Sequence, residues 1–235
     1  MADTSAEPLV LIPGLLCSAA LFAPQVAALS QYRTVVVADH TRSNRLEQIA
    51  RDVLAAAPPR FALAGLSMGG YVAMEVMRQA PERVTRVAFL DTSARPDPPE
   101  RAVDRHRLIE IARAEGVRNV QGLLLPRLVH PGRLNEASLT DIILQMAEAT
   151  GLDAFVRQQE AIIARPDSRP SLPAIRGPAL VLVGAQDLQT PPDVAEEISA
   201  GIAGSRLVVV PDCGHLSTLE RPSAVNAALQ SWLGA

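Results

Sequence analysis

Short apolar runs alternate with longer amphipathic segments along most of the chain. The runs lie at residues 9–12, 34–38, 61–64, 84–90, 180–183 and 207–210. Runs of this kind, separated by helical patterns, are typical of buried parallel strands that are joined through helices. We therefore predict an α/β fold with a mainly parallel sheet flanked by helices.

The segments between these runs carry apolar residues at spacings of three and four, which predicts amphipathic helices. The predicted helices cover residues 21–29, 46–56, 68–79, 192–199 and 223–233. Pro192 suits the first turn of a helix, and Pro81 marks the end of the helix before it.

The alternation stops between about residues 93 and 177. In this region the pattern predicts helices at 99–115, 118–125, 136–150 and 152–164, followed by a linker punctuated by Pro166, Pro170, Pro173 and Pro178. We interpret residues 94–176 as a helical lid, inserted after the Val84–Leu90 strand and covering the edge of the sheet. Residues 1–93 and 177–235 would then form the core.

Composition narrows the possible chemistry. All 22 basic residues are arginines, so the chain has no lysine for a Schiff base, a pyridoxal phosphate linkage or a P-loop. The net charge is -3 and no basic stripe stands out, so we expect no nucleic-acid partner. With 48% hydrophobic but only 3% aromatic residues, the core must consist of small aliphatic side chains, which favours buried parallel strands.

The first eight residues lack the basic and apolar regions of a signal peptide, and no apolar stretch is long enough to span a membrane. We expect a cytoplasmic protein in which Cys17 and Cys213 are buried free thiols rather than a disulfide. No cluster has metal-ligand spacing and no glycine-rich dinucleotide motif follows a strand, so we expect no metal and no cofactor. The sequence leaves the oligomeric state open.

The motif Gly-Leu-Ser-Met-Gly at residues 65–69 matches the G-x-S-x-G pattern. In that pattern a serine lies on a sharp turn between a strand and a helix, where small neighbours relieve crowding. The predicted strand before Ser67 and the predicted helix after it supply this context. The alternative is a glycine-rich turn with an unreactive serine.

A nucleophilic serine requires a base and an acid that orients the base. Among His40, His106, His130 and His215, only His215 lies between the last apolar run and the last predicted helix. Asp187 follows the 180–183 run, and the carboxyl ends of parallel strands are where sites assemble. Ser67, Asp187 and His215 are therefore the candidate catalytic residues. Asp91, at the end of the 84–90 run, is the alternative acid, although it also suits a capping role.

These features resemble the α/β-hydrolase fold superfamily over nearly the whole chain. The resemblance is carried by residues 11–15, the turn at 65–70, the acid turn at 184–187 with Pro191, the turn at 214–215 and the position of the lid. It implies an oxyanion hole made by the backbone N–H groups of Leu15 and Met68. Many members have His-Gly where this chain has Pro13-Gly14, so the backbone donors remain but the histidine's role is absent. The chain begins at what resembles the third strand of the full fold, which indicates a compact member.

The resemblance implies a serine hydrolase that cleaves small carboxylic esters through an acyl-enzyme. His215 would accept the Ser67 proton, and Asp187 would orient the imidazole. The alternatives are a triad-dependent lyase, an enol-lactonase or a carbon-carbon bond hydrolase acting on a carboxylated substrate, or a ligand receptor without activity. Peroxide could also replace water in a side activity, as in cofactor-free haloperoxidases.

The remaining polar candidates have two interpretations each. His40 follows a strand and suits a turn or a place near the mouth of the site, and His106 and His130 suit either lid packing or substrate contact. Arg42 and the lid arginines would either pair with acids or bind a substrate carboxylate, which a guanidinium can hold with two hydrogen bonds.

Overall fold

The computed structural model describes residues 6–234, in which six parallel strands form one sheet of order β2-β1-β3-β4-β5-β6. The strands are β1 (Leu9–Ile12), β2 (Val35–Val37), β3 (Phe61–Leu66), β4 (Val84–Leu90), β5 (Ala179–Gly184) and β6 (Arg206–Val210). The predicted α/β fold is confirmed. The expectation about a signal peptide rests partly on residues 1–5, which lie outside the described residues.

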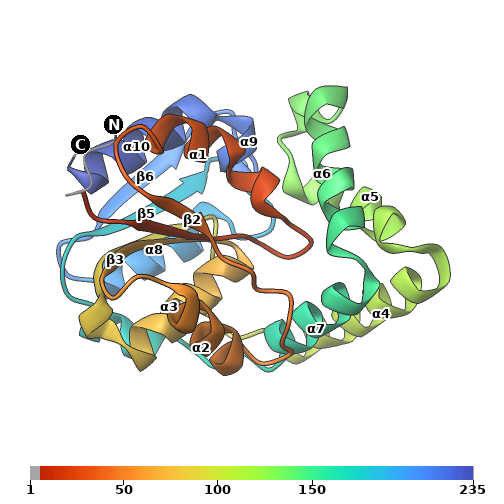
Figure 1. Cartoon of the computed structure of the whole chain (residues 1–235). Helices are drawn as coiled ribbons and strands as arrows, with labels where there is room; N and C mark the ends of the chain where they lie inside the picture. The colour runs from red at the N-terminus through yellow and green to blue at the C-terminus, as the bar shows by residue number, and fades with distance from the viewer. Residues whose placement is uncertain (1–5, 235) are drawn as a thin grey trace.

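The sheet lies between two layers of helices (Figure 1). On one face are α1 (Ala23–Leu29), α9 (Ser217–Glu220) and α10 (Pro222–Leu233), with the short turn η1 (Ala19–Phe22). On the other face are α2 (Leu46–Ala56), α3 (Met68–Gln79) and α8 (Pro192–Gly201), with η2 (Pro81–Arg83). Every residue of β1, β3 and β5 is buried, as expected for strands that are covered on both faces.

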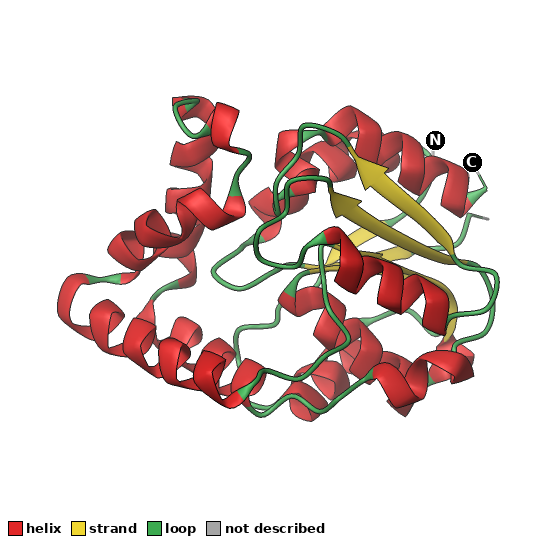
Figure 2. Cartoon of the chain, turned by 180° about the vertical axis from the view of Figure 1, so that it is seen from behind, coloured by secondary structure: helices red, strands yellow, loops and turns green. Residues whose placement is uncertain are grey.

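Four helices between β4 and β5 stand to one side of the sheet (Figures 1 and 2). They are α4 (Pro99–Glu115), α5 (Val117–Leu128), α6 (Ala137–Thr150) and α7 (Leu152–Ile163), with the turns η3 (Pro131–Arg133) and η4 (Arg169–Ala174). We call this segment the helical insertion. Its own apolar cluster includes Ile109, Val120 and Phe155, and Leu16 from the loop after β1 joins that cluster. The insertion and the core are therefore packed together through this loop.

Three local features differ from the sequence prediction. Helix α5 continues to Leu128 through Pro126, although we expected it to end at residue 125. Pro126 lies in the last turn and is exposed, so the Gly122 carbonyl that loses its hydrogen bond can be solvated. The predicted linker contains η4, and the short helix α9 has too few residues to show a periodic pattern.

The order of the strands indicates where a ligand-binding site is expected in this sheet. From β1 the chain crosses to β2 on one side, and then to β3 on the other side of β1. The connections therefore diverge between β1 and β3, and ligands of open parallel sheets bind at such a switch point beyond the carboxyl ends of the strands. The loop after β1 contains Leu15, and the turn after β3 contains Ser67.

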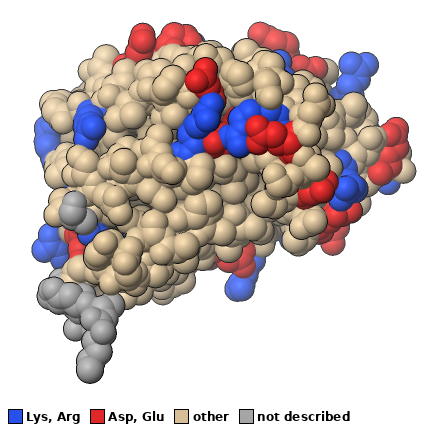
Figure 3. Space-filling view, turned by 90° about the horizontal axis from the view of Figure 1, so that it is seen from above, with Lys and Arg blue, Asp and Glu red and all other residues tan. Residues whose placement is uncertain are grey.

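The surface charges are largely paired. In the view from above, arginine and acidic side chains lie beside one another and most of that face is uncharged (Figure 3). Arg133 with Glu136 and Arg42 with Asp39 are examples, each with a nitrogen–oxygen distance of 2.7 Å. Within residues 6–234, no helix combines the length and the apolar character that crossing a membrane requires.

Glycines allow β1, β3 and α3 to approach closely. A Cβ on Gly65 would lie 2.2 Å from the Gly69 carbonyl oxygen, and a Cβ on Gly69 would lie 2.0 Å from the Ile12 carbonyl oxygen. Because these neighbours are backbone atoms, they cannot move aside as a flexible side chain can. The two glycines of the motif are therefore required by packing.

We expect Gly69→Ala to lower the free energy of unfolding by about 1–3 kcal/mol or more, the usual effect of overpacking. Gly122→Ala is the matched control, since no atom lies within 4 Å of the added Cβ. In helix α5 it should raise stability by up to about 1 kcal/mol. Urea unfolding followed by circular dichroism measures both, and equal effects of the two variants would contradict the packing account.

Candidate active site

Ser67 lies on a strained turn between β3 and α3. Its backbone has φ 54° and ψ -116°, a conformation that L-residues rarely adopt. The turn is held from β4, because the Ser67 amide donates to the Leu90 carbonyl oxygen at 2.9 Å and the Thr92 hydroxyl donates to the Ser67 carbonyl oxygen at 2.7 Å. The half-buried serine is thereby fixed at the carboxyl end of the sheet.

The structure brings Ser67, His215 and Asp187 together in one hydrogen-bonded chain. His215 Nε2 lies 2.9 Å from Ser67 Oγ, and His215 Nδ1 lies 2.8 Å from Asp187 Oδ2. His215 is 2% exposed and Asp187 is 1% exposed, so water screens the pair weakly. This is the geometry in which an imidazole can take the hydroxyl proton while the acid holds its other nitrogen.

Asp187 is fixed by its own loop. Its Oδ1 accepts from the amides of Gln189 and Thr190 at 2.7 and 2.9 Å, and its Oδ2 accepts from the Thr190 hydroxyl at 2.8 Å. The sequence analysis did not identify Thr190. An aspartate followed three residues later by threonine is a signal of such a side-chain turn, and it could have been found.

Asp91, the alternative acid, makes other contacts. Its Oδ1 accepts from the Gly184 amide at 2.9 Å, and the Ser217 hydroxyl donates to its Oδ2. Burial and the nearby Asp187 raise the pKa of Asp91 well above its usual range. In this arrangement Asp91 links β5 to α9, while Asp187 contacts the imidazole.

The charges around His215 act in opposite directions. Burial lowers the pKa of His215, but the charge of Asp187, its hydrogen bond and the charge of Asp91 raise that pKa above the ordinary value of 6.5. An imidazole whose cation is stabilised in this way is suited to accept a proton during a reaction.

The loop that carries His215 is held by Glu220. Its two carboxylate oxygens accept from the amides of Gly214 and His130 at 3.0 and 2.9 Å. The His215 amide donates to the Leu128 carbonyl oxygen of α5 at 3.0 Å. The helical insertion therefore contacts the histidine loop directly, which no local sequence pattern indicated.

The loop after β1 is held by the insertion as well. Leu16 has φ 56°, and its amide donates to Gln158 Oε1 of α7 at 3.1 Å. His40 Nε2 lies 2.9 Å from the Gly14 carbonyl oxygen, to which the neutral ring donates. Burial lowers the pKa of His40 and so favours that neutral form. His40 is a buried partner of this loop, and Gln158 was not identified from the sequence.

The two predicted oxyanion donors belong to segments next to Ser67. Met68 begins α3, and Leu15 lies in the loop after β1. Among the described residues, neither the Leu15 nor the Met68 amide donates a hydrogen bond to another group. Both N–H groups therefore lack a protein acceptor, as the predicted role requires.

A small cavity of about 40 Å³ opens at Ser67. Its lining is largely apolar, with Leu15, Leu66, Leu124, Leu128 and Leu216 around Ser67 and His215. Cys17 also lines it. Cys17 and Cys213 are free and buried, as predicted, and burial raises the pKa of Cys17 to about 12, so Cys17 remains a thiol near neutral pH.

The other candidate residues lie elsewhere. His106 is exposed and contacts its own helix through the Ala102 carbonyl oxygen, while the His130 ring accepts from the Gly132 amide. Arg42 pairs with Asp39 on the surface. Within residues 6–234, no group of three or more histidine, cysteine or acidic residues is arranged to hold a metal ion.

Comparison with known proteins gives a consistent picture. Residues 9–228 match the alpha/beta hydrolase family. A thermophilic esterase from Thermogutta terrifontis, solved with malate bound, superposes with a TM-score of 0.90 at 30% identity, over 99% of this chain and 91% of the esterase. The enol-lactonase from Burkholderia xenovorans superposes equally well, with a TM-score of 0.90 at 30% identity over 100% and 94% of the two chains.

A relative identified by sequence is also an enol-lactonase. The 3-oxoadipate enol-lactonase 2 of Acinetobacter baylyi is 27% identical over 192 residues, which cover 80% of this chain and 70% of the relative. The similar proteins thus share a fold and a broad class of hydrolytic chemistry, while their substrates differ.

We expect the pKa values of the two buried histidines to be shifted in opposite directions from the ordinary value. The imidazole of His215 should titrate above pH 6.5 and that of His40 below it. Asp187→Asn should lower the pKa of His215, because it removes the neighbouring charge. The raised pKa of His215 stabilises the fold fully below pH 6.5, and that contribution is lost as the pH rises through the higher folded value.

Nuclear magnetic resonance titration of histidine-labelled protein measures both pKa values. A His215 pKa below 6.5 in the unmodified protein, or one that Asp187→Asn leaves unchanged, would contradict the electrostatic account.

Proposed function

The chain belongs to the alpha/beta hydrolase family, and on that premise we propose that it is a serine hydrolase that cleaves small carboxylic esters through an acyl-enzyme. The observation that carries this proposal is the continuous hydrogen-bonded chain from Ser67 through His215 to Asp187. In the proposed reaction Ser67 Oγ attacks the ester carbonyl, and His215 Nε2 takes the hydroxyl proton and then donates it to the leaving alcohol. Water attacks the acyl-enzyme by the reverse of this sequence.

Asp187 would hold the imidazole with Nδ1 protonated, so that Nε2 is free to act as the base. The buried carboxylate would also stabilise the imidazolium that forms during attack. The Leu15 and Met68 amides would donate to the oxyanion, an interaction worth roughly 3 kcal/mol for each donor in proteins where it has been measured. Their lack of other hydrogen-bond acceptors among the described residues supports this role.

The volume of the cavity favours a substrate with a small acyl group. Its volume of about 40 Å³ is a few times the roughly 10–15 Å³ that one water molecule requires. Its leucine lining suits an alkyl chain. We propose that the helical insertion is a lid, since it contributes Leu124 and Leu128 to this lining and contacts both the loop after β1 and the histidine loop.

Ser67→Ala should abolish hydrolysis of p-nitrophenyl acetate and butyrate, because it removes the hydroxyl that lies 2.9 Å from His215 Nε2. Ser138→Ala, an exposed position in α6, is the matched control and should retain full activity. Release of p-nitrophenol measures both rates. Substantial turnover by the Ser67 variant would show that another nucleophile acts.

Replacement by asparagine should lower activity much more at Asp187 than at Asp91. Asp187→Asn should lower kcat by roughly 10⁴-fold, the effect seen when the acid of such a triad loses its charge. Asp91→Asn preserves the shape of that side chain and should cost less than roughly tenfold, the equivalent of 1.4 kcal/mol. The same p-nitrophenyl assay compares the two variants, and a larger loss in the Asp91 variant would make Asp91 the catalytic acid.

A further inference from the structure

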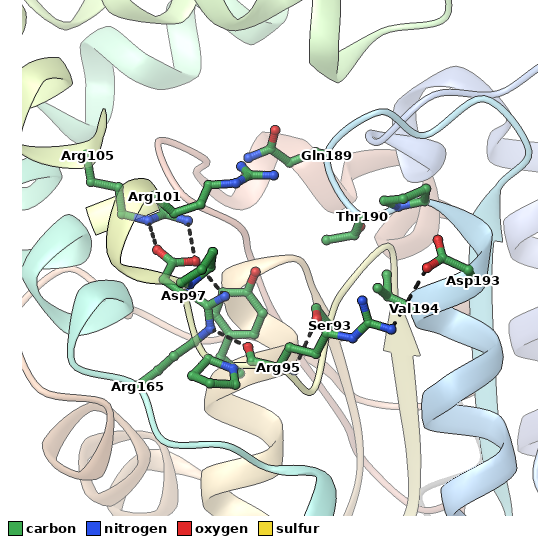
Figure 4. A pocket seen from close by; sticks show the side chains of 14 residues that line it. Ser93, Arg95, Asp97, Arg101, Arg105, Arg165, Gln189, Thr190, Asp193 and Val194 are labelled. Carbon is green, nitrogen blue, oxygen red and sulfur yellow. Dashed lines mark hydrogen bonds and ion pairs between the residues drawn. The ribbon is translucent and has the colours of Figure 1, made fainter. Parts of the chain in front are cut away.

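A second and larger cavity lies beside the acid loop. It has a volume of about 320 Å³ and is bounded by the loop after β4, the start of α4, residues 189–191 and α8 (Figure 4). Four arginines line it: Arg95, Arg101, Arg105 and Arg165. Since the chain has no lysine, these are the fixed positive charges that a ligand would meet there.

Most of these arginines already have acidic partners. Arg95 pairs with Glu197 at 2.8 Å and lies 3.9 Å from Asp193. Arg105 and Arg165 both pair with Asp97, whose side chain is only 5% exposed. Two guanidinium groups therefore share one buried carboxylate, and this corner of the cavity keeps a surplus of positive charge.

Arg101 adds to that surplus. Among the described residues its guanidinium makes neither an ion pair nor a hydrogen bond, and in Figure 4 it points toward Gln189. Arg101 also lies in the first turn of α4 (Pro99–Glu115), where the helix dipole disfavours a cation. Neither an ion pair nor helix stability accounts for the position of Arg101. A guanidinium without a partner can bind a ligand carboxylate with two parallel hydrogen bonds.

The rest of the lining supplies further donors. The Tyr71 hydroxyl has no hydrogen-bond partner among the described residues, and the Ser93 hydroxyl accepts from the Arg95 amide, which leaves its own proton free. An unpaired guanidinium with uncommitted hydroxyl donors selects for an anion and against a cation or an alkyl chain.

The two cavities adjoin at one residue. Gln189 lines both the small cavity at Ser67 and the larger cavity. Thr190, its neighbour, lines the larger cavity and donates to Asp187. A molecule whose ester group lies at Ser67 would reach the larger cavity, and Arg101, on the side of Gln189.

We propose that the larger cavity binds a carboxylate on the substrate and that Arg101 is the residue that selects it. The inference rests on the proposed ester hydrolysis at Ser67 and specifies its substrate class: monoesters of dicarboxylic acids. The carboxylate binds at a distance from the reacting carbonyl, so Arg101 contributes to binding and takes no part in proton transfer.

The test compares pairs of substrates that differ only in charge. Monoethyl succinate, glutarate and adipate are each compared with the ester in which an uncharged amide replaces the carboxylate, and ethanol release is followed. The unmodified protein should prefer the anionic member of at least one pair by roughly tenfold to a hundredfold in kcat/KM, the range expected for a charge-assisted hydrogen bond.

Arg101→Gln should remove most of this preference by raising the KM of the anionic ester, with the amide ester unchanged. Arg107→Gln, at an exposed position of the same helix outside both cavities, is the matched control and should keep the preference. Arg101→Lys should restore part of it, since a point charge remains without the bidentate geometry. Thermal unfolding of each variant verifies that it folds.

The experiment distinguishes failure of the carboxylate site from failure of the proposed hydrolase activity. If the protein cleaves neutral esters with Ser67 dependence but shows no preference in any pair, the carboxylate site is wrong and the proposed hydrolase stands. If Arg101→Gln lowers the rates for both members of a pair equally, Arg101 has a structural role and the proposal is overturned. If no ester of any charge is cleaved, the proposed function itself fails.

Discussion

The turn at Ser67 is the constraint on which the rest of the structure depends. A non-glycine residue with φ 54° is held there because both ends are fixed: the amide donates to β4, and α3 packs against the backbone of β1 through Gly69. This packing sets the distance between the loop after β1 and the start of α3. It therefore places the Leu15 and Met68 amides relative to the Ser67 hydroxyl. The motif contains glycines because α3 approaches the backbone of β1 too closely for a larger residue.

The helical insertion contacts the loops of the site on two sides. Leu16 packs into the apolar cluster of the insertion, and its amide donates to Gln158 of α7. On the opposite side, α5 accepts the His215 amide at Leu128, and Arg127 donates to the Leu188 carbonyl oxygen at 2.9 Å. The loop after β1, the loop that carries His215 and the loop that carries Asp187 thus each contact the same insertion. A movement of these helices would change the geometry of the site as well as its accessibility.

Local sequence patterns were sufficient for most of the elements, though not for α9 or the end of α5, and for the three residues that meet at the site. The predicted ranges 46–56, 68–79 and 84–90 match α2, α3 and β4, because apolar periodicity and proline positions act locally. The order of Ser67, Asp187 and His215 after successive strands follows from the parallel topology. Gln158 and Glu220 escaped prediction because their partners Leu16 and His130 lie 142 and 90 residues away in the chain. The sequence also left Asp187 and Asp91 as alternatives, and only the packing of the loops distinguishes their contacts.

Covalent labelling with a fluorophosphonate tests the central claim most directly, since this reagent reacts with an activated serine and needs no knowledge of the substrate. The absence of lysine simplifies the readout: trypsin cleaves after arginine alone, and residues 61–78 form one peptide whose only serine is Ser67. The account predicts one adduct per chain, found by mass spectrometry on this peptide and lost in His215→Ala. An unlabelled protein, or a label on a different peptide, would contradict it.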